Sequence, residues 1–523
     1  GKDAFGRSSG LAVVQAPRAL PRVIQLPTDI EGNGPHDFVF LSSVMHAFVE
    51  DLFPGMEVLG CYQFRITRNS DLFVDEEEID DLLRALEGEL QSRRHGDVVR
   101  LEVARNCPRE LVDYLLSQFE LTEPDLYQNN GPVNLGRMME VLDLLDCREL
   151  LFAPFAPGLP KEIKPGGCIF EAIAKRDILV HHPFQTFLPV IDFLKQAALD
   201  SDVIAIKQTL YRTGANSAVV DALVVAAKAG KEVTVVIELR ARFDEEDNIR
   251  LANRLQEAGA HITYGVVGFK THAKMVMVVR REGRKLVQYV HFGTGNYHPR
   301  TARLYTDYGL FTCNEQMGDD AHRVFMQLTS LGKWKKLDTL LQSPFTLHDK
   351  ILNKIAHEKA LADSGKPGRV IIKVNSLTEP KSIQALYEAS QSGVEIDLIV
   401  RGICVLRPGV EGISENIRVR SVIGRFLEHP RVYFFGNDGS PEIYCASADL
   451  MERNLFNRVE VAFPLLDKKV RQRIIRELQY YLDDNQQSWQ LMQNGRYERI
   501  DCAEGEEPVS AQQLLLEKLA DRC

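Results

Sequence analysis

Apolar and polar residues alternate with two different periods along much of the chain, and these periods predict its helices and strands. VIAIKQTLYR (203–212) and KEVTVVIEL (231–239) are short apolar runs of the kind that form buried strands. Between them, NSAVVDALVVAAKAG (216–230) has the spacing of a helix and ends in Gly, a usual helix stop. A helix over 244–260 and a strand over 261–267 follow. Alternating strands and helices predict an α/β fold with a mostly parallel sheet.

A second copy of this layout lies further along the chain. RVIIKVNSL (369–377) and VEIDLIVRG (394–402) are predicted strands, and PKSIQALYEASQSG (380–393) is a predicted helix. Lys207 in the first copy aligns with Lys373 in the second. A layout that occurs twice in one chain predicts two similar α/β lobes related by a pseudo-two-fold repeat.

The residues before these lobes have a different pattern, so we predict three domains. Short apolar runs such as VRLEVA mix there with helical stretches such as EEIDDLLRALEGELQSRR, which is an α+β pattern. KEIKPGG (161–167) punctuates the chain with Pro and Gly. The predicted domains are an α+β head over 1–165, a first lobe over 166–340 and a second over 341–523. The opening residues GKDAFGRSSG have no initiator Met and read as the interior of a longer protein.

Each lobe contains a short motif with candidate chemistry. His272 and Lys274 stand two apart at the start of the run KMVMVV, and His429 and Arg431 stand two apart before VYFF. Residues i and i+2 of a strand point to the same face, so each motif presents an imidazole beside a cation. A lone His is more often structural, because a catalytic site needs several converging groups. The repetition instead favours an active site for an anion at the interface of the lobes.

Further phosphate-binding features follow the first histidine. The loop from Gly293 through Thr294 to Asn296 offers backbone N–H groups of the kind that bind phosphate oxygens, although taken alone it predicts only a tight turn. Arg300 and Arg303 follow closely, and Arg is the preferred partner for bidentate phosphate contacts.

Other histidines of the first lobe are predicted to be structural. His181 and His182 lack a third ligand at a suitable spacing, so we expect a turn before the helix in PFQTFLPVIDFLKQA. We expect His291 to be a packing residue and do not expect His298 to hold phosphate. The C-terminal stretch KKVRQRIIRELQYYLDD has helical spacing and a basic face.

Charge and composition narrow the class of ligand. The net charge of −10 argues against a general nucleic-acid-binding protein, since such domains are usually basic. Residues 75–81 are acidic, whereas 270–309 contain eight Lys and Arg against two acids, which indicates a specific anionic ligand. The nine Cys form no CxxC pair and no run of about 18 apolar residues occurs. We therefore expect a cytoplasmic protein with reduced thiols and no membrane span, and leave peripheral membrane association open.

The first motif resembles the half-site of the phospholipase D superfamily, His-x-Lys-x4-Asp followed by Gly-Ser/Thr-x-Asn. The matching residues are His272, Lys274, Gly293, Thr294 and Asn296. Val279 stands where the superfamily has Asp. In the second half Arg431 replaces Lys, and ASADLMERN (446–454) replaces the Gly-Ser-x-Asn loop. These departures argue against a standard lipase or nuclease of that superfamily.

Six separated segments occur in the order found in polyphosphate kinases of the histidine-phosphorylating type, and the chain resembles that family. They are FDEEDN, KTHAK, GTGNYHPRTARLYTDYGL, LIVRGICVLRPG, EGISENIRVRSVIGRFLEHPRVYFFGN and SADLMERNLFNRVEVAFPLLD. The resemblance implies two phospholipase D-like lobes and reversible transfer of the ATP γ-phosphate to inorganic polyphosphate through a phosphohistidine. It also implies a homo-oligomer, and it places the family's N-terminal domain, which contributes to nucleotide binding, outside this chain.

The resemblance also implies roles for single residues. His272 is the expected nucleophile, and His429 resembles the family's second histidine, with acid–base or phosphate-stabilising work. Lys274 would keep the imidazole of His272 neutral, and Asp307 would orient it. The expected ATP- and phosphate-binding residues are Tyr305, Arg401, His429, Arg458, Arg212, Arg242 and Arg303.

Mg²⁺, bound together with ATP, is the implied cofactor. Arg212 and Arg242 resemble positions that the family associates with the magnesium–phosphate region. Arg has no lone pair to give a metal, so we expect both to bind phosphates that carry Mg²⁺. Glu238 and Asp244 lie nearby in sequence, and we expect them to be surface acids at a helix N-terminus rather than ligands.

Two other functions stay open at this point. A phosphodiesterase of the phospholipase D type, acting on lipid or DNA, would share the half-site, although Val279 and Arg431 count against it. A non-catalytic protein that binds polyphosphate or nucleotide would share the cations. Labelling with γ-labelled ATP distinguishes these functions, because only the kinase forms a phosphohistidine.

Overall fold

The computed structural model of the chain describes residues 10–17, 19–69, 96–212, 217–239, 245–266, 268–329 and 336–521. These residues belong to two compact units, one made of the described residues up to 153 and the other of those from 154 onward. The helix predicted over 77–94 lies outside the described residues. The division at 165 and at 340 into three domains remains a prediction.

The first unit is a small α+β structure. Its three-stranded sheet consists of β3 (Phe64–Arg68), β4 (Val98–Ala104) and β5 (Leu126–Asn129), with β3 antiparallel and β5 parallel to β4. Helix α3 (Arg109–Gln118) buries Val112, Leu115 and Leu116 in one cluster with the β4 residues Leu101 and Val103. A hairpin-like pair, β1 (Val23–Gln25) and β2 (Phe38–Phe40), leads into α1 (Leu41–Ala47).

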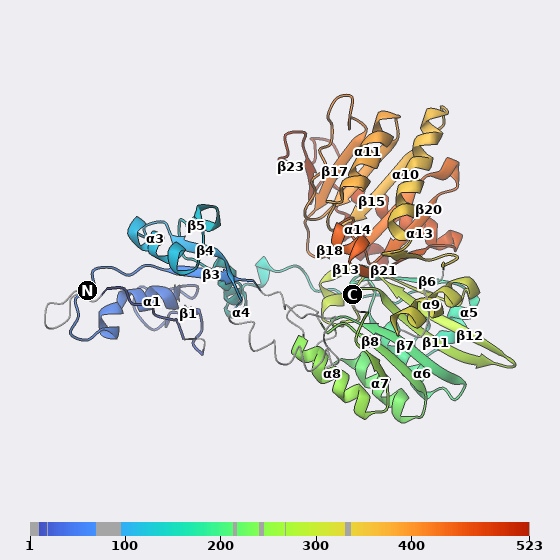
Figure 1. Ribbon diagram of the computed structural model, residues 1–523, viewed down its shortest axis with the longest axis horizontal. Helices are drawn as coiled ribbons and strands as arrows, with labels where there is room; N and C mark the ends of the chain where they lie inside the picture. Colours follow the sequence, from blue (N-terminus) through green and yellow to red (C-terminus); the bar gives the residue numbers. More distant parts are fainter. Residues whose placement is uncertain are drawn as a thin grey trace. The chain divides into compact units, whose positions relative to one another are not determined.

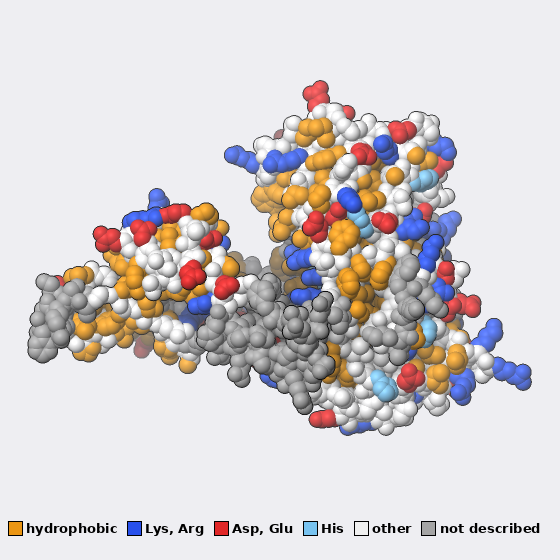
Figure 2. Space-filling view, in the orientation of Figure 1, with side chains coloured by type: hydrophobic (Ala, Val, Ile, Leu, Met, Phe, Trp, Pro, Cys, Tyr) orange, Lys and Arg blue, Asp and Glu red, His pale blue; other side chains and the backbone are white. Residues whose placement is uncertain are grey.

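Many apolar side chains of this first unit remain on its surface. Met139, Leu142 and Leu150 are 66%, 61% and 76% exposed, and Figure 2 shows apolar side chains spread over the visible face. They lie on or beside the short helices η4 (Leu135–Glu140), α4 (Val141–Leu144) and η5 (Arg148–Leu150). The core of this unit is therefore small relative to its apolar content.

The first α/β lobe is built on a mixed eight-stranded sheet in the order β18-β13-β12-β11-β7-β8-β9, with β6 beside β13 (Figure 1). Its own strands are β6 (Ile178–His182), β7 (Val203–Leu210), β8 (Glu232–Ile237), β9 (His261–Thr263), β11 (Lys274–Glu282), β12 (Lys285–Gly293) and β13 (Tyr305–Thr312). Its helices are α5 (Ile169–Lys175), α6 (Leu188–Leu199), α7 (Ala218–Lys228), α8 (Glu245–Glu257) and α9 (Glu315–Leu328). Helices α6, α7 and α8 lie side by side along the sheet (Figure 1).

The second lobe repeats this plan with a ten-stranded mixed sheet in the order β10-β21-β20-β19-β15-β16-β17-β22-β23, with β14 beside β21. Its own strands are β14 (Leu341–Ser343), β15 (Arg369–Val374), β16 (Glu395–Val400), β17 (Ile417–Val422), β19 (Arg431–Phe435), β20 (Glu442–Ala446), β21 (Arg458–Pro464), β22 (Ser488–Leu491) and β23 (Tyr497–Arg499). Its helices are α10 (Leu347–Asp363), α11 (Pro380–Gln391), α12 (Glu452–Phe456), α13 (Lys468–Asp483) and α14 (Ala511–Leu519). The predicted α/β class with two similar lobes is confirmed.

The two lobes exchange short strands across their interface. Strand β10 (Lys270–Thr271) leaves the first lobe and pairs in parallel with β21, whereas β18 (Leu427–Glu428) leaves the second lobe and pairs in parallel with β13. One hydrophobic cluster spans both lobes, and the rings of Phe292 and Phe463 stack across it with centroids 5.4 Å apart. The lobes are therefore one packed body.

Two expectations about this region were wrong. The sheets are mixed rather than mostly parallel, because β11 and β12 are joined by a tight hairpin, which only antiparallel strands can use. The alignment of Lys207 with Lys373 is off by two residues: Lys207 pairs with Met277, five residues after His272, whereas Lys373 pairs with a residue only three after His429. A shift of two keeps the same strand face, so the apolar pattern did not reveal the error.

The pair His181 and His182 also differs from expectation, since it does not form a turn. Both residues end the buried strand β6, where they pair with Tyr308 and Asp307 of β13.

The basic helix predicted near the C-terminus is α13, and it buries Ile474 and Leu478 in the shared core. Across the part of the chain that the structure describes, none of the helices combines the length and the apolar character that crossing a bilayer requires.

Candidate active site

His272 lies where the chain crosses from one lobe to the other. It stands between β10, which pairs with the second lobe, and β11, which belongs to the first. The backbone N–H groups of His272 and Ala273 both donate to the carbonyl oxygen of Val459, each at 2.9 Å. Thr209 receives the N–H of Met275 at 3.0 Å and donates its hydroxyl to the Ala273 carbonyl at 2.7 Å. The crossing segment is thus held from both lobes.

The imidazole of His272 is oriented by a carboxylate of the other lobe. His272 Nδ1 lies 2.9 Å from Glu460 Oε2, and Glu460 also accepts from the Ser447 hydroxyl at 2.5 Å and from the Asn454 amide at 2.7 Å. Both oxygens of Glu460 accept from donors of the second lobe, and we assign Oε2 as the acceptor for Nδ1 too, which puts the proton on Nδ1 and the lone pair on Nε2. No described residue hydrogen-bonds this Nε2.

The surroundings of His272 keep its imidazole neutral. Burial lowers the pKa of His272 well below its ordinary value, and the cations Lys274, Arg458 and Arg431 lower it further. The ring is 9% exposed and meets the Tyr211 ring edge-on with centroids 4.9 Å apart. A neutral imidazole with its lone pair on Nε2 is a nucleophile at neutral pH.

Lys274 is buried two residues after His272 and forms no ion pair with a carboxylate among the described residues. Its ammonium group donates to the carbonyl oxygen of His272 and lies 5.2 Å from the centroid of the Tyr211 ring. Burial lowers the pKa of Lys274 well below its ordinary value, although the charge of Glu460 raises it. An anion bound here would stabilise the positive charge of the Lys274 ammonium group and so raise its pKa again.

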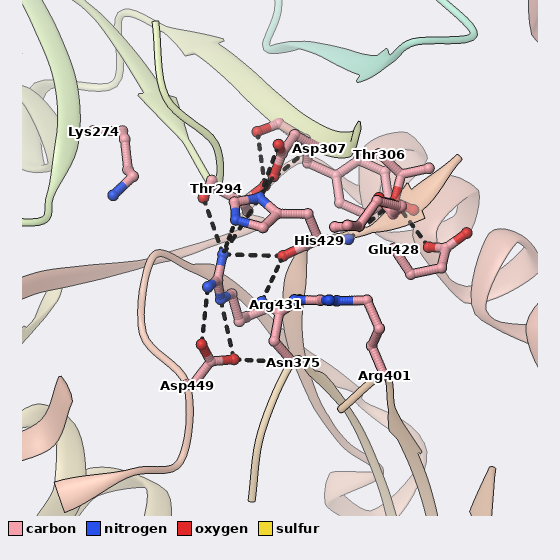
Figure 3. A network of polar contacts seen from close by, with 12 residues as sticks. Lys274, Thr294, Thr306, Asp307, Asn375, Arg401, Glu428, His429, Arg431 and Asp449 are labelled. Atoms are coloured by element: carbon pink, nitrogen blue, oxygen red, sulfur yellow. Dashed lines mark hydrogen bonds and ion pairs between the residues drawn. The ribbon is translucent and has the colours of Figure 1, made fainter. Parts of the chain in front are cut away.

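His429 has the same position in the other half of the site (Figure 3). Its Nδ1 lies 2.8 and 2.9 Å from the two carboxylate oxygens of Asp307, and Asp307 accepts from the Thr294 hydroxyl at 2.6 Å. Burial lowers the pKa of His429, while Asp307 raises it and Arg431 lowers it. Unlike the first half, a guanidinium lies against the imidazole here: Arg431 Nη1 is 3.2 Å from His429 Nε2 and 3.5 Å from His429 Nδ1.

Arg431 is paired where Lys274 is not (Figure 3). Its Nε and Nη2 donate to the two oxygens of Asp449 at 3.2 and 2.9 Å. This guanidinium lowers the pKa of Asp449 to about 2. Asn375 connects the pair to Arg401: its backbone N–H donates to Asp449 at 2.7 Å and its side-chain oxygen accepts from Arg401 at 2.8 Å.

The sheet registers show that the two half-sites are equivalent. In the first half-site Lys270 pairs with Arg458, and two residues further along stand His272 and Glu460. In the second half-site Leu427 pairs with Tyr305, and two residues further along stand His429 and Asp307. Glu460 is thus the counterpart of Asp307. The expectation that Asp307 orients His272 is wrong, because the strand exchange gives each histidine the carboxylate of the opposite lobe.

The glycine-rich loop after β12 supports the second histidine rather than the first. A Cβ on Gly295 would lie 2.0 Å from Asp307 Oδ2, so only glycine leaves room for the carboxylate that holds His429. Thr294 accepts the backbone N–H of Tyr308 at 3.0 Å and donates to Asp307. Asn296 Oδ1 is buried and has no hydrogen-bond partner among the described residues.

The structure places several other expected residues around this centre. Tyr305 packs its ring 5.4 Å from that of His429, and Arg401 is half-buried with its pKa lowered by burial. Arg458 begins β21 and contributes positive charge to His272 and Glu460. Arg303 is exposed at the end of the short helix η6 (Thr301–Arg303).

The predicted magnesium–phosphate region is described in part. Arg212 is half-buried beside Tyr211, and Arg242 and Asp244 lie outside the described residues. Glu238 is not a surface acid, since it is 3% exposed and accepts the backbone N–H of Thr271 at 2.7 Å. The strand carrying it ends in the lobe interface, and burial there overrides the helix-N-terminus pattern.

The last two histidines considered are His291, expected to be a packing residue, and His298, not expected to hold phosphate. His291 is buried in β12, where its Nδ1 lies 2.9 Å from the Tyr297 hydroxyl oxygen, as expected for a packing residue. Burial lowers the pKa of His291 to about 3. His298 Nδ1 accepts the backbone N–H of Arg300 at 3.2 Å and so helps to shape the loop.

Sequence reasoning missed Glu460, Ser447 and Asp449. All three lie in the second lobe, and Glu460 is 188 positions away from the histidine that it orients. The repeat was the available signal: the spacing from Thr294 to Asp307 recurs from Ser447 to Glu460.

The two repeated α/β lobes meet at one interface, and each lobe contributes an imidazole and a cation to it. This arrangement defines a class of two-lobed enzyme for phosphoryl chemistry. Sequence models of the polyphosphate kinase middle domain and its C-terminal domains 1 and 2 match residues 1–141, 168–334 and 340–512. The chain belongs to the polyphosphate kinase family.

Individual relatives agree with this assignment. A polyphosphate kinase of Pseudomonas aeruginosa is 56% identical over 520 residues, which cover 99% of this chain and 75% of that protein. One of Pseudomonas putida is 57% identical over 521 residues, covering 100% and 72%. The crystal structure of the polyphosphate kinase from Porphyromonas gingivalis matches with a TM-score of 0.81 and 31% identity, covering 96% of this chain and 73% of that one.

Proposed function

We propose that this chain transfers the γ-phosphate of ATP to inorganic polyphosphate, reversibly, through a phosphohistidine on Nε2 of His272. The observation that carries the proposal is the contact of His272 Nδ1 with Glu460. It leaves Nε2 as the lone-pair nitrogen of a neutral ring at the lobe interface. The names of the relatives supply the substrates, and the geometry supports the role of the nitrogen.

The reaction takes place in two displacements. In the first, His272 Nε2 attacks the γ-phosphorus, the bond from that phosphorus to the bridging oxygen breaks, and ADP leaves with the electron pair. In the second, a terminal oxygen of polyphosphate attacks the same phosphorus and the N–P bond breaks. Glu460 remains the hydrogen-bond acceptor of the Nδ1–H group in both steps and stabilises the positive charge that develops on the ring. Splitting one transfer into two is the usual benefit of covalent catalysis.

Cations of both lobes stabilise the phosphoryl oxygens in the transition state. Lys274 and Arg431 follow the two histidines by two residues each, Arg458 begins β21 and Arg401 directly follows β16. Transferring phosphoryl groups carry their charge on the peripheral oxygens, so preorganised cations lower the barrier. We assign Arg303 and Arg212 to the outer phosphates, together with Arg242.

His429 assists from the opposite side. Its pKa is lowered by burial, so it is neutral near pH 7 and can accept a proton from the attacking terminal phosphate. A bound phosphate would give Arg431 a charged acceptor in place of its contact with the His429 ring. Tyr305 packs beside His429, and we assign it to the face of the nucleotide.

We expect Mg²⁺ to arrive with ATP. Within the described ranges no group of three or more His, Cys, Asp or Glu side chains could hold a metal ion. The ion would therefore be held mostly by phosphate oxygens and water, as Mg²⁺ commonly is. We also propose a cytoplasmic homo-oligomer that acts on ATP, ADP and polyphosphate and not on nucleic acid.

Labelling tests the proposal. Incubation with γ-labelled ATP and Mg²⁺ should give a protein-bound phosphate that is labile in acid and stable in base, and added polyphosphate or ADP should remove it. His272→Ala should abolish the label. An acid-stable label, or turnover of a phosphodiester without ATP, would contradict the proposal.

A further inference from the structure

The strand that precedes His429 is very short and has a neighbouring strand on one side. Strand β18 contains only Leu427 and Glu428, which pair with Tyr305 and Thr306 of β13. The backbone N–H of Leu427 donates to the carbonyl oxygen of Leu304 at 3.0 Å. Two residues of parallel pairing hold a strand weakly, so the position of His429 depends on what lies on the other side.

A side-chain amide from the C-terminal helix occupies that other side. Gln512 Oε1 accepts the backbone N–H of Phe426 at 2.9 Å, and its Nε2 donates to the Phe426 carbonyl at 2.8 Å. The same Nε2 donates to Glu428 Oε1 at 2.7 Å. The amide thus replaces the donor and the acceptor of a neighbouring strand. Gly424 leaves room for it, since a Cβ there would lie 2.5 Å from Gln512 Oε1.

The chain of contacts continues from Gln512 to His429. The second oxygen of Glu428 accepts from the Thr306 hydroxyl at 2.8 Å and from Lys373 Nζ at 2.7 Å. The backbone N–H of His429 in turn donates to the Thr306 hydroxyl at 3.2 Å. Gln512 and Glu428 are 2% and 3% exposed, so these contacts are protected from water.

We propose that Gln512 of α14 is a positioning residue that holds His429 in line with Asp307 for phosphoryl transfer. The inference rests on the proposed function only in giving His429 a catalytic task. It assigns the C-terminal helix, which lies far in sequence from both histidines, to the second half-site.

The helix itself is firmly anchored, so it can define a position. Its first backbone N–H, on Ala511, donates to Asp484 Oδ2 at 2.7 Å, and the Ser510 hydroxyl accepts from the backbone N–H of Gln513. Leu515 is fully buried in the core shared by the lobes. Two other residues of the same helix offer matched controls, because Gln513 is exposed and Leu515 is buried apolar packing.

The first half-site has an analogous support, which argues that a third contact is a requirement of this architecture. Strand β10 is also two residues long, pairs with one strand, and precedes its histidine directly. There the carboxylate of Glu238 accepts the backbone N–H of Thr271 at 2.7 Å. Each histidine therefore follows a two-residue strand that a buried side chain of a third element holds.

Charged and titratable groups face His429 from several elements, and each enters the expected titration. Asp307 and Tyr305 of β13, Arg431 of β19 and Asp449 after β20 act on His429 directly. Lys373 of β15, Arg401 after β16 and Tyr481 of α13 interact with Glu428, the residue before His429. Burial is the largest cause of the lowered pKa of His429. Loosening β18 admits water and should raise that pKa toward the ordinary value of about 6.5.

The test compares Gln512→Ala with Gln513→Ala and Leu515→Ala in the full chain. The ring signals of His429, assigned with His429→Gln, are followed by NMR between pH 4 and 8. Steady-state kcat and KM for ATP and the melting temperature are measured on the same proteins. We expect Gln512→Ala to raise the pKa of His429 and to lower kcat about tenfold with KM within about twofold, because misplacement affects the transition state.

The controls make the outcome decisive. Leu515→Ala should lower the melting temperature at least as much as Gln512→Ala and leave the titration of His429 unchanged, and Gln513→Ala should change neither. The inference is overturned if Gln512→Ala leaves the titration at the unsubstituted position, or if Leu515→Ala shifts it equally. If the unsubstituted chain forms no phosphohistidine, the proposed function fails, yet the titration still decides the role of Gln512.

Discussion

The two half-sites have the same backbone but different charges, and this difference assigns their roles. His272 with Glu460 and Ser447 repeats His429 with Asp307 and Thr294, in the same sheet register and with the same contacts. The two half-sites differ in what surrounds their cations, Lys274 and Arg431. Arg431 is neutralised by Asp449 and contacts the second imidazole, whereas the position equivalent to Asp449 in the first half is Asn296.

The charge difference has a chemical consequence. Lys274 has no carboxylate partner among the described residues, so an incoming phosphate can pair with it, and Nε2 of His272 stays unoccupied by any described donor. In the second half the arginine is held by one carboxylate and lies against the imidazole ring. One scaffold thus supplies a nucleophile in one half and a supporting acid–base group in the other.

The largest expected effect separates the two histidines. His272→Gln should abolish phosphoenzyme formation, because it removes the nitrogen to which the proposed reaction attaches the phosphate. His429→Gln should leave the labelling of His272 by ATP largely intact but slow overall turnover by about a hundredfold or more, as expected for a lost acid–base group. Single-turnover labelling and steady-state rates, measured on both variants, check this. Equal loss of labelling in both would show that the halves are not divided as described.

Next in size is the exchange of the orienting carboxylates for amides. Glu460→Gln should slow labelling of His272 about a hundredfold, because the amide can donate to Nδ1 and so favour the tautomer with its proton on Nε2. Asp307→Asn should slow labelling by less than about threefold, since Asp307 acts on His429. Rapid-quench measurement of the labelling step compares the two. A larger effect from Asp307→Asn would restore the original assignment of that residue to His272.

The third prediction concerns stability in acid. Asp449 has a folded-state pKa of about 2, below its unfolded value near 3.9. Its ionised form therefore stabilises the fold above the unfolded pKa, by about 2 kcal/mol, and this contribution is lost as pH falls from about 4 through 2.

Asp449→Asn removes that contribution and also leaves Arg431 buried without its carboxylate. Urea unfolding of this variant should give a lower free energy than the unsubstituted chain at pH 7 and a smaller difference at pH 3. A difference that does not shrink toward low pH would contradict the assigned pair.

The smallest effect is expected from making the first half resemble the second. Asn296→Asp should place a carboxylate near Lys274, raise the pKa of His272 and protonate more of the nucleophile. Labelling by ATP should slow by about threefold to tenfold at pH 6 and recover as pH rises, because the neutral imidazole is restored. Asn353→Asp, which adds the same charge at an exposed position of α10, should change nothing. An unchanged pH profile for Asn296→Asp would refute the charge argument.

Much of the fold was predictable because its information is local. Apolar runs and Gly stops predicted β7, α7, β8 and α11 close to their observed bounds, and the repeated layout predicted the two lobes. The motif of His272 and Lys274 is also local, although the structure places His272 between β10 and β11 rather than in the strand that Lys274 begins.

The carboxylate partners were not predictable in this way, because their positions depend on the strand exchange. Glu460 reaches His272 only because β10 leaves its own lobe to pair with β21. Nothing in the sequence near His272 records that crossing. Applying the repeat to Asp307 would have found Glu460, but assigning it to the correct histidine requires the structure.

The central claim is that phosphate is carried by Nε2 of His272 and by no other nitrogen. The direct measurement is ³¹P NMR of the phosphoenzyme, trapped at alkaline pH after incubation with ATP and Mg²⁺, combined with peptide mapping of the labelled site. The account predicts a single phosphohistidine, in the peptide containing residue 272, with the chemical shift of an Nε2 adduct. Phosphate on Nδ1 of His272, or in the peptide containing His429, would contradict it.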